Sequence, residues 1–164
     1  MKKQIKFYGR TKPDPKYWPF SNFYPAPFVD SAGITWPTTE HYFQAMKFLP
    51  GEICKLNSLF TCREYIRRAK TPGEAAQIGR SRDLPLRKDW EEVKDQYMYK
   101  ALWYKFTQHQ DLRELLCETN DAELIEHTYK DSYWGDGGDG TGKNMLGVLL
   151  MKIRKNIIKG NKHE

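Results

Sequence analysis

The sequence predicts an α+β fold in which helices outweigh a few short strands. Apolar residues recur at helical spacing in several segments after residue 38. The first 37 residues are rich in proline, glycine and aromatic residues and offer only short strand-like runs. No internal repeat, low-complexity tract or linker interrupts the 164 residues, and a chain of this length is typical of one domain. We therefore expect a single compact domain over residues 1–164.

The composition favours a folded protein that binds anions. Aromatic residues make up 14% of the chain, whereas disordered chains are poor in them. The formal charge of +6 favours phosphates, nucleotides or nucleic acid as ligands. A solvated basic surface without a specific partner is an equally good interpretation of the charge alone.

The sequence also indicates a cellular compartment. The cysteines Cys54, Cys62 and Cys117 lack the spacing of a metal or redox motif and fit reduced thiols. The N-terminal residues 1–6 have no apolar run behind their charges, so they are not a signal peptide. No uncharged apolar run is long enough to span a membrane. We expect a soluble cytoplasmic protein with no membrane contact, and the sequence leaves its oligomeric state open.

The first half of the chain contains two strand-like runs and one clear helix. Lys3–Tyr8 and Phe28–Trp36 predict short strands, the second turning at Ala32-Gly33. Thr38 is a typical N-cap, and the helix that it opens ends at Pro50-Gly51. The apolar residues of this helix are Tyr42, Ala45, Met46 and Leu49.

Two capping patterns open the next helices. Thr71-Pro72-Gly73-Glu74 is a capping box that predicts a short helix through Ile78. Asp89 and Glu92 repeat the pattern ahead of a long helix. Its apolar stripe consists of Trp90, Val93, Tyr97, Ala101, Leu102 and Phe106.

The last third of the chain predicts two more helices and a strand. Asp111 starts a helix, and Leu124–Thr128 predicts a brief strand. A closing amphipathic helix follows, and the tail Lys159–Glu164 is expected to be frayed. The apolar face of the closing helix consists of Leu146, Leu149, Leu150, Ile153 and Ile157.

The most unusual segment is residues 135–142, which contain five glycines. Gly137-x4-Gly142-Lys143-Asn144 nearly spells a P-loop, but Asn144 replaces the Ser or Thr that coordinates magnesium, and no buried strand precedes the loop. We therefore reject an NTPase. The segment predicts a generic anion site, with free backbone N–H groups at a helix N-terminus and Lys143 beside them. The alternative is a surface loop in which Asn144 caps the helix.

Glu40 lies in the first turn of the helix that follows Thr38, where the helix dipole favours an ionised carboxylate. Such a carboxylate can stabilise a cationic transition state or orient a water molecule. Gln44 and Lys47 follow on neighbouring faces, at spacings of four and three residues. The alternative is that Glu40 only caps the helix. His41, which has no metal-ligand spacing around it, is expected to be a packed or surface histidine.

Two further segments mix polar or basic residues with aromatic ones. Within residues 20–24, aromatic rings could sandwich a base while Ser21 and Asn22 read its edge or a ribose hydroxyl. The basic stretch 79–90 could hold a phosphate and stack a base on Trp90. The alternatives are aromatic residues in the core and a solvated loop with Trp90 packed beneath it.

Four motifs occur in a fixed order along the chain. They are Phe20-Ser21-Asn22-Phe23, Trp36-Pro37-Thr38-x-Glu40-His41-Tyr42-Phe43-Gln44-Ala45-x-Lys47-Phe48, Gly79-Arg80 with Pro85-Leu86-Arg87-x-x-Trp90, and Tyr133-Trp134-Gly135-Asp136-Gly137-Gly138 through Gly142-Lys143-Asn144-x-Leu146-Gly147. Together they resemble the NADAR (YbiA-like) family over about residues 5–158. The resemblance implies a compact α+β fold and N-glycosidase chemistry without a metal or redox cofactor.

The resemblance also implies a substrate class. Bacterial and plant members hydrolyse ribosylaminopyrimidine phosphates, the first intermediates of riboflavin biosynthesis, and release ribose 5-phosphate. Other members remove ADP-ribose from modified guanine in DNA or RNA. We expect the first activity, on a small phosphorylated ribosyl substrate. ADP-ribosylated nucleic acid as substrate is the alternative, and a non-catalytic module that binds ADP-ribose or a related nucleotide is a third hypothesis.

The resemblance assigns the catalysis to two carboxylates of this chain. Glu40 is expected to face the anomeric carbon, with Asp136 as the second carboxylate. One group stabilises an oxocarbenium-like state while another activates water or protonates the leaving nitrogen, and the sequence leaves these roles open. The expected ribose, phosphate or base contacts are Ser21, Asn22, Lys47, Trp90 and Trp134, with Arg82, Lys143 and Asn144 as further candidates. The inserted-looking stretch Lys12–Tyr17 is expected to reshape one rim of the pocket.

Overall fold

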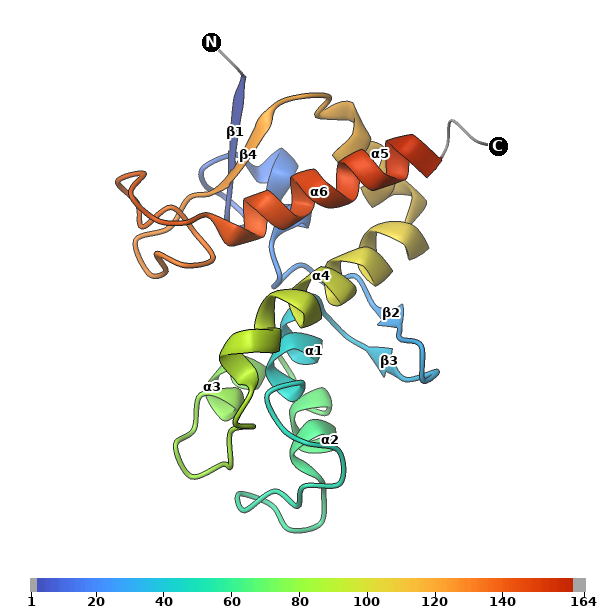
Figure 1. Ribbon diagram of the computed structural model, residues 1–164, viewed down its shortest axis with the longest axis vertical. Helices are drawn as coiled ribbons and strands as arrows, with labels where there is room; N and C mark the ends of the chain where they lie inside the picture. Colours follow the sequence, from blue (N-terminus) through green and yellow to red (C-terminus); the bar gives the residue numbers. More distant parts are fainter. Residues whose placement is uncertain (1–2, 161–164) are drawn as a thin grey trace. The chain divides into compact units, whose positions relative to one another are not determined.

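A computed structural model describes residues 3–160 and confirms an α+β fold dominated by helices (Figure 1). The described residues form two compact units. The first unit comprises residues 3–24 and 106–160, and the second comprises Pro25–Lys105. The long helix α4 (Trp90–Gln108) contributes residues to both units. Among the described residues, no helix combines the length and the apolar character that crossing a membrane requires.

The first unit is built on two parallel strands that are distant in sequence. β1 (Gln4–Phe7) pairs with β4 (Glu123–Glu126), and Ile5 lies opposite Leu124. The 3₁₀ helix η1 (Pro15–Phe20) packs on β1. The apolar residues of both strands point into the core of this unit, where Phe7 and Leu124 are fully buried.

Helices α5 (Gln110–Glu118) and α6 (Met145–Gly160) complete the first unit. α6 packs closely on β4 because Gly147 has no side chain, and a Cβ at this position would collide with the carbonyl oxygen of Leu124. Arg154 ties α6 to the segment that follows α5, since its guanidinium donates to Oγ1 of Thr119 at 2.6 Å and to the carbonyl of Ala122 at 2.9 Å. The buried face of α6 includes the predicted Leu146, Leu149, Leu150, Ile153 and Ile157.

The second unit begins with a small hairpin. β2 (Phe28–Val29) pairs antiparallel with β3 (Thr35–Trp36), as the run Phe28–Trp36 predicted. Asp30 holds the turn between the strands. Its carboxylate accepts hydrogen bonds from the N–H groups of Ala32 and Ile34 and from the indole nitrogen of Trp36.

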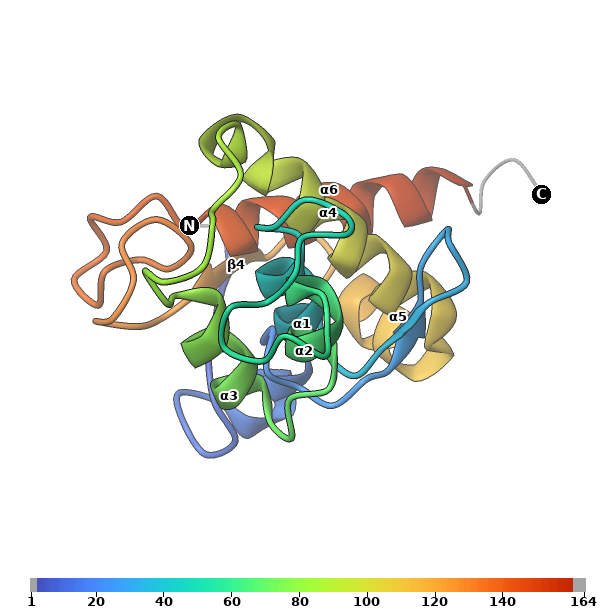
Figure 2. The same ribbon diagram turned by 90° about the horizontal axis from the view of Figure 1, so that it is seen from below.

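Three short helices pack against one another in the second unit (Figure 2). They are α1 (Thr39–Ala45), α2 (Cys62–Arg67) and α3 (Pro72–Gly79). Every residue of α1 is buried, so α1 is the helix on which the other two pack. The hydroxyl of Thr38 accepts from the N–H of His41 and caps α1, and Thr71 caps α3 in the same way. Both caps are the predicted ones.

Two elements were not expected from the sequence, α2 and η1. Each has six residues, too few for an apolar period to show. η1 lies in part within the stretch Lys12–Tyr17, and it contains Pro19 as well as Pro15. These prolines argued against a helix at the sequence level, because proline has no backbone N–H to donate to a helical hydrogen bond.

Several boundaries also differ from the expectation, and the largest difference is that α1 ends at Ala45 rather than at Pro50-Gly51. α5 begins at Gln110 with His109 as its N-cap, whereas the sequence indicated Asp111. β4 ends at Glu126, two residues before the expected end. α6 continues through Gly160, so the start of the tail is helical rather than frayed. Residues 161–164 of the tail lie outside the described residues.

Candidate active site

Glu40 is held in the first turn of α1 and only 5% of it is exposed. Its Oε1 accepts a hydrogen bond of 2.7 Å from Nε2 of Gln44, one turn later on the helix. The sequence left open whether Glu40 only caps the helix. In the structure the cap is Thr38, whose hydroxyl accepts a hydrogen bond from the N–H of His41. The side chain of Glu40 is therefore directed into the second unit by α1 and oriented there by Gln44.

Gln44 connects Glu40 to α3. Its side chain fills the space above Gly79, where an added Cβ would lie 2.8 Å from the Cβ of Gln44. Its Oε1 is buried and makes no hydrogen bond among the residues that the structure describes. A buried acceptor in that state costs about 1–3 kcal/mol. A ligand or water that donates to this oxygen would remove the cost.

Lys47 lies just beyond the end of α1 and is half-buried. Its Nζ donates a hydrogen bond of 3.3 Å to the carbonyl of Gly79. Burial lowers the pKa of Lys47 below its ordinary value, the negative charge of Glu40 opposes this effect, and the positive charge of Arg80 adds to it. The attraction is mutual, so Lys47 favours an ionised carboxylate at Glu40. We call Glu40, Gln44 and Lys47 the α1 row.

Trp90 and Arg82, two other predicted substrate contacts in the second unit, lie outside the α1 row. Trp90 is 5% exposed, and its ring packs on Phe43 and Tyr97 with centroids 5.0 Å and 6.2 Å apart. In this structure the ring fills the core, which is the alternative that the sequence left open. Arg82 is exposed on the loop that follows α3. Whether either residue contacts substrate stays a prediction.

His41 occupies a packed position. It is 1% exposed, its Nδ1 lies 2.8 Å from the hydroxyl of Thr38, and its Nε2 lies 3.1 Å from the carbonyl of Ala69. Burial lowers its pKa, and the hydrogen bond to Ala69 opposes this effect. The structure confirms the expectation of a packed histidine.

Asp136 is buried at the start of the glycine-rich loop of the first unit. Its Oδ1 accepts from the N–H groups of Thr128 at 3.1 Å and Gly138 at 2.9 Å, and its Oδ2 lies 2.8 Å from Nδ1 of His127. Burial acts to raise the pKa of Asp136, but the hydrogen bonds from His127, Gly138 and Thr128 outweigh it and hold the pKa below its ordinary value. Asp136 is therefore an ionised anchor for the residues around it.

Many backbone N–H groups of the glycine-rich loop and of the start of α6 have acceptors in the structure, whereas the sequence predicted free ones. Eight of them donate to acceptors within residues 131–136. These eight groups are engaged within the protein, and an anion contact at Lys143 stays a prediction. The donors concerned are the N–H groups of Gly137, Gly138, Gly140, Gly142, Lys143, Asn144, Met145 and Leu146.

Asn144 joins the glycine-rich loop to β4. Its Oδ1 accepts from the N–H of Glu126 at 2.9 Å, and its Nδ2 donates to the carbonyl of Leu124 at 2.8 Å. The amide of Asn144 thus supports the strand. Lys143 is exposed, and its Nζ lies 5.1 Å from the centroid of the Tyr133 ring.

Trp134 is half-buried, and its ring meets the edge of the Tyr133 ring at a centroid distance of 5.1 Å. Ser21 and Asn22 follow η1 directly and are both buried. The hydroxyl of Ser21 accepts from the N–H of Phe23 at 3.3 Å. The Oδ1 of Asn22 makes no hydrogen bond within the described part of the chain, so it can accept one from a ligand or water.

The predicted residues divide between the two units. In the second unit, α1 brings Glu40 and Lys47 together, and Arg82 and Trp90 follow on the loop and helix beyond α3. The first unit holds Ser21, Asn22, Trp134, Asp136, Lys143 and Asn144. Among residues 3–160, no cluster of three or more His, Cys, Asp or Glu side chains is arranged to hold a metal ion.

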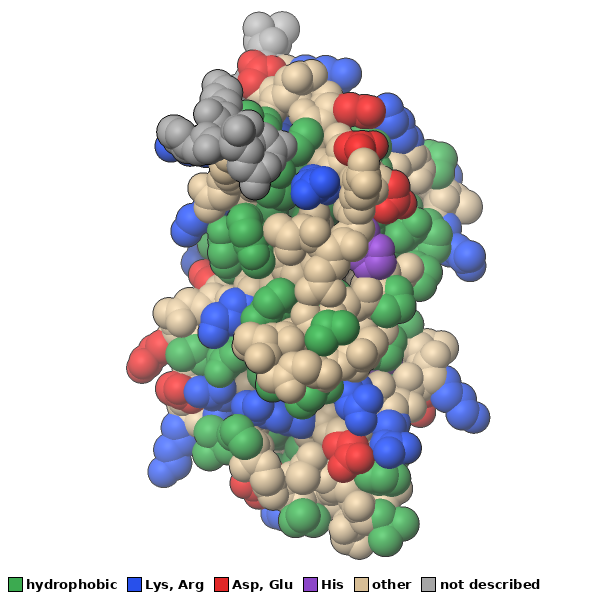
Figure 3. All heavy atoms as spheres, turned by 90° about the vertical axis from the view of Figure 1, so that its right-hand side faces the viewer, with side chains coloured by type: hydrophobic (Ala, Val, Ile, Leu, Met, Phe, Trp, Pro, Cys, Tyr) green, Lys and Arg blue, Asp and Glu red, His purple; other side chains and the backbone are tan. Residues whose placement is uncertain are grey.

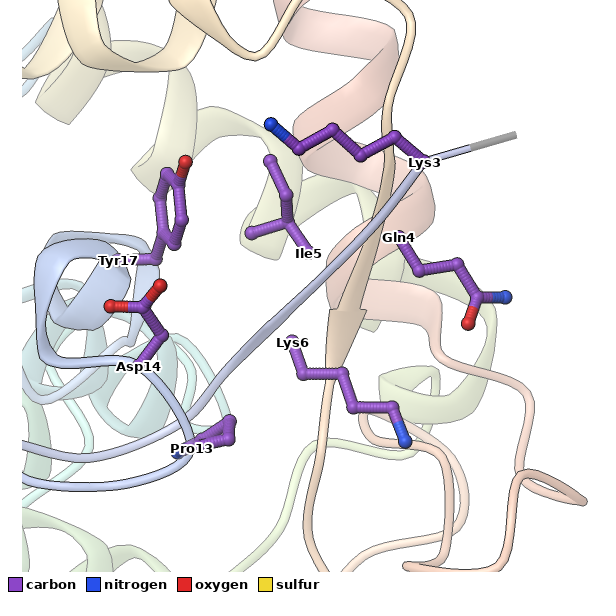
Figure 4. Close-up of a pocket in the computed structure, with 7 residues that line it drawn as sticks. All are labelled: Lys3, Gln4, Ile5, Lys6, Pro13, Asp14 and Tyr17. Atoms are coloured by element: carbon purple, nitrogen blue, oxygen red, sulfur yellow. The ribbon is translucent and has the colours of Figure 1, made fainter. Parts of the chain in front are cut away.

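A pocket of about 340 Å³ lies beside β1 in the first unit (Figure 4). It contains none of the predicted site residues, but it does include part of the stretch Lys12–Tyr17. It is lined by Lys3, Gln4, Ile5, Lys6, Pro13, Asp14 and Tyr17. That stretch therefore borders a pocket, although not one that the predicted contacts share.

The sequence analysis missed His127, the side chain that pairs with Asp136. His127 follows the last residue of β4, a position from which a side chain can leave the sheet. The expected strand Leu124–Thr128 included His127 and so hid it. A titratable residue at the end of a predicted strand was the signal that could have identified it.

A comparison with known proteins places the chain among N-glycosidases. The NADAR domain model matches residues 6–158, which include parts of both units. The chain is 52% identical over 153 residues to N-glycosidase YbiA of Escherichia coli strain K12, covering 93% of this chain and 88% of that protein. It is 40% identical to an N-glycosidase of Nostoc punctiforme, covering 93% and 92%.

Two further similarities concern biological context and fold. A riboflavin biosynthesis protein of Vibrio vulnificus is 36% identical over 96% of this chain, which corresponds to 39% of that longer protein. The NMR structure of the Escherichia coli protein YbiA is similar with a TM-score of 0.83 and 50% sequence identity, covering 100% of this chain and 90% of that one. The fold and the sequence therefore indicate the same relatives.

Proposed function

We propose that this chain, which belongs to the NADAR family and is an N-glycosidase, hydrolyses the ribose C1–N bond of a ribosylaminopyrimidine phosphate of riboflavin biosynthesis. The products are ribose 5-phosphate and the free aminopyrimidine. Similar proteins in Vibrio vulnificus and Zea mays carry riboflavin biosynthesis in their names. That context supports this substrate class for the present chain.

The α1 row is the observation that carries the proposal. A buried carboxylate is oriented by Gln44, and Lys47 favours its charged form. Cleavage of a C1–N bond develops positive charge on the ribose ring, and an ionised carboxylate in a desolvated place stabilises that charge strongly. Glu40 is thus suited to face the anomeric carbon. The Oε1 of Gln44, which has no hydrogen-bond partner among the described residues, is suited to accept a hydrogen bond from a ribose hydroxyl.

The reaction balances without any further reactant. The oxygen of a water molecule forms a bond to C1 while the C1–N bond breaks and leaves its electron pair on nitrogen. One proton of the water is transferred to that nitrogen, which departs as an amine. Glu40 contributes charge stabilisation, and a separate group of the protein handles the proton.

The charge of the protein does not by itself choose between a small substrate and a polynucleotide. On the face shown in Figure 3, several Lys and Arg side chains gather in a band across the lower half, and elsewhere Asp and Glu side chains lie among the basic ones. A polynucleotide requires a continuous basic surface, whereas a single phosphate does not. The names of the relatives, rather than the charge, therefore support the small substrate.

We also propose that the residues 1–164 form one NADAR domain with its core at about residues 5–158, and that it acts in the cytoplasm, where its free cysteines stay reduced.

A hydrolysis assay on two substrates tests the proposal. Purified protein is incubated separately with the ribosylaminopyrimidine phosphate and with a short oligonucleotide that carries ADP-ribosylated guanine. We expect turnover of the first substrate with release of ribose 5-phosphate. Glu40→Gln serves as the inactive preparation, and Glu92→Gln, an exposed residue on α4, is the matched control that keeps full activity.

The alternatives give different results in the same assay. Turnover of the oligonucleotide alone would identify a nucleic-acid hydrolase and contradict the proposed substrate. A protein that binds either compound but converts neither would be a binding module, and the proposal would then be wrong.

A further inference from the structure

Lys47 lies in a short segment, residues 46–48, whose three backbone carbonyls each accept a hydrogen bond from one of two arginines. Nε of Arg63 on α2 donates to the carbonyl of Phe48 at 2.8 Å. The backbone N–H of Arg87 donates to the carbonyl of Lys47 at 2.9 Å, and its guanidinium reaches the carbonyl of Met46 at 3.5 Å. Because the helical pattern ends here and offers these carbonyls no donors, the two arginines supply them.

The side chain of Arg87 is itself held on several sides. Its Nε and one terminal nitrogen donate to the two carboxylate oxygens of Asp89 at 2.6 Å and 2.8 Å, and its other terminal nitrogen donates to the hydroxyl of Tyr97 at 2.9 Å. Only 11% of this side chain is exposed, and the contact with Asp89 raises its pKa. A planar guanidinium can make such a paired contact, whereas an ammonium group cannot. The side chain therefore fixes where the N–H of Arg87 meets the carbonyl of Lys47.

The ammonium group of Lys47 is also bordered by the motif to which Arg87 belongs, Pro85-Leu86-Arg87-x-x-Trp90. The ring of Trp90 packs on the ring of Phe43 with centroids 5.0 Å apart, and Nζ of Lys47 lies 5.9 Å from the centroid of Phe43. Nζ also donates to the carbonyl of Gly79. The motif thus contacts the backbone of Lys47 directly and borders its ammonium group through Phe43.

The influence of Arg87 on Lys47 can be separated from that of the nearby charges. Burial is the largest effect on the pKa of Lys47 and lowers it, Glu40 and Glu91 raise it, and Arg80 lowers it. Arg87 acts on the segment through hydrogen bonds to backbone carbonyls. A substitution of Arg87 that keeps the positive charge therefore changes where the ammonium group lies. All of these residues belong to the second unit, so the arrangement is defined within that unit.

We propose that Arg87 is a positioning residue of the hydrolysis, which holds the end of α1 so that the ammonium group of Lys47 stays within reach of the charge of Glu40. The inference rests on the proposed function, in which the ionised carboxylate stabilises positive charge on the ribose. In this role Arg87 acts through Lys47 and does not contact the substrate. Without its contacts residues 46–48 shift, the ammonium group moves away from the carboxylate, and the transition state is stabilised less.

A double-mutant cycle separates this role from a general contribution to folding. Arg87→Lys keeps the charge but loses the paired contact with Asp89, and we expect kcat to fall by on the order of 10- to 10²-fold with KM changed less than about threefold. Lys47→Met lowers kcat by on the order of 10²-fold. In the Lys47→Met protein, Arg87→Lys should lower kcat further by less than about twofold. Full additivity of the two losses would overturn the proposal.

The matched control is Arg68→Lys in the same unit. Arg68 is exposed at the end of α2, where it forms a surface ion pair of 3.4 Å with Glu64, and this variant should keep the wild-type kcat. Asp89→Asn covers the case in which Arg87→Lys does not fold. It loosens Arg87 from a carboxylate that is 45% exposed, and it should lower kcat in wild type but not in Lys47→Met. An unchanged kcat in folded Arg87→Lys or Asp89→Asn would overturn the proposal.

An NMR titration of Lys47 tests the position of its ammonium group without any substrate. In the wild-type background Glu40→Gln should lower the pKa of Lys47, because a negative charge that raises it is removed. In the Arg87→Lys background the same substitution should shift this pKa by less than half as much. Equal shifts in both backgrounds refute only this inference, whereas absence of wild-type turnover of the ribosylaminopyrimidine phosphate refutes the proposed function and with it the role of Arg87.

Discussion

Nε2 of Gln44 donates a 2.7 Å hydrogen bond to Oε1 of Glu40 across one turn of α1. The space for the Gln44 side chain exists because Gly79 on α3 has no Cβ. A glycine on one helix therefore fixes the orientation of a carboxylate on another. This relationship makes the proposed site sensitive to changes that do not touch Glu40 itself.

Gly79→Ala should impair both stability and turnover. The new methyl group would stand 2.8 Å and 3.0 Å from the Cβ and Cδ atoms of Gln44, so the Gln44 side chain must move and its hydrogen bond to Glu40 weakens. Overpacking of this kind costs about 1–3 kcal/mol of unfolding free energy. Urea unfolding and steady-state kinetics measure the two effects.

The control for Gly79→Ala is Gly73→Ala on the same helix, where the nearest atom is the Thr71 hydroxyl at an ordinary 3.7 Å. It should be neutral or slightly stabilising, because alanine is the better helix former. Equal kcat values for Gly79→Ala and wild type would show that Gln44 does not orient a catalytic carboxylate.

The pKa of Lys47 should respond to its neighbours with predictable signs. Burial lowers it, Glu40 raises it and Arg80 lowers it. Glu40→Gln should therefore lower the pKa of Lys47 further, whereas Arg80→Ala should raise it. An NMR titration of the Lys47 Cε and Nζ signals measures both shifts, with the exposed Arg82→Ala as the control. An unchanged titration in Glu40→Gln would mean that the two groups are not coupled.

Lys105 should make the protein more stable as the pH rises. It is fully buried on α4, and burial lowers its pKa to about 7. Between about pH 7 and pH 10 the unfolded chain holds this proton and the folded protein does not, so the unfolding free energy increases by up to about 1.4 kcal/mol per pH unit. Below that window both states are protonated and the dependence disappears.

Urea unfolding of wild type and Lys105→Met isolates this contribution, because the cysteines and other groups titrate alike in both proteins. The unfolding free energy of wild type minus that of Lys105→Met should increase from pH 7 to pH 9. A difference that is constant with pH would indicate that Lys105 stays charged in the folded protein.

Asn144 should contribute more to the stability of the fold than to substrate binding. It has φ of 51° and makes two hydrogen bonds to the backbone of β4. Asn144→Ala should cost about 3–4 kcal/mol, from about 1 kcal/mol for each of the two hydrogen bonds and about 1–2 kcal/mol for alanine in a left-handed backbone conformation. Asn120 has the same φ but only an exposed hydrogen bond to Glu118, so Asn120→Ala should cost less.

The outcome also decides the substrate contact expected at Asn144. If Asn144→Ala leaves the unfolding free energy unchanged and raises KM instead, the side chain binds substrate and its contacts with β4 are secondary. Thermal unfolding and KM, measured on the same preparation, distinguish the two roles.

Local signals predicted most of the secondary structure. Thr38 and Thr71 were expected to be caps, and both are. Such a cap is predictable because its hydrogen bond joins a hydroxyl to the N–H three residues later and so depends only on neighbouring residues. The parallel pairing of β1 with β4 could not be predicted. Gln4 and Glu123 are 119 residues apart, and four-residue strands carry too little pattern to identify a partner.

The site was predictable only in part. Motifs identified Glu40 and Asp136, but not that the carboxylate of Asp136 accepts from two backbone N–H groups and pairs with His127. The hydrogen bonds of the glycine-rich loop could not be predicted, because glycine content indicates flexibility and says nothing about where backbone N–H groups find acceptors. In the structure many of those acceptors lie in residues 131–136, at the start of the loop and just before it.

The most direct test of the central claim is to measure kcat and substrate affinity of Glu40→Gln on the ribosylaminopyrimidine phosphate. The account predicts that the release of ribose 5-phosphate falls by on the order of 10³-fold or more. The dissociation constant, measured by calorimetry, should stay within about threefold, since the substitution conserves shape and the Gln44 contact. A Glu40→Gln protein that turns over like wild type would contradict the assignment of the charged carboxylate at α1 as the centre of the reaction.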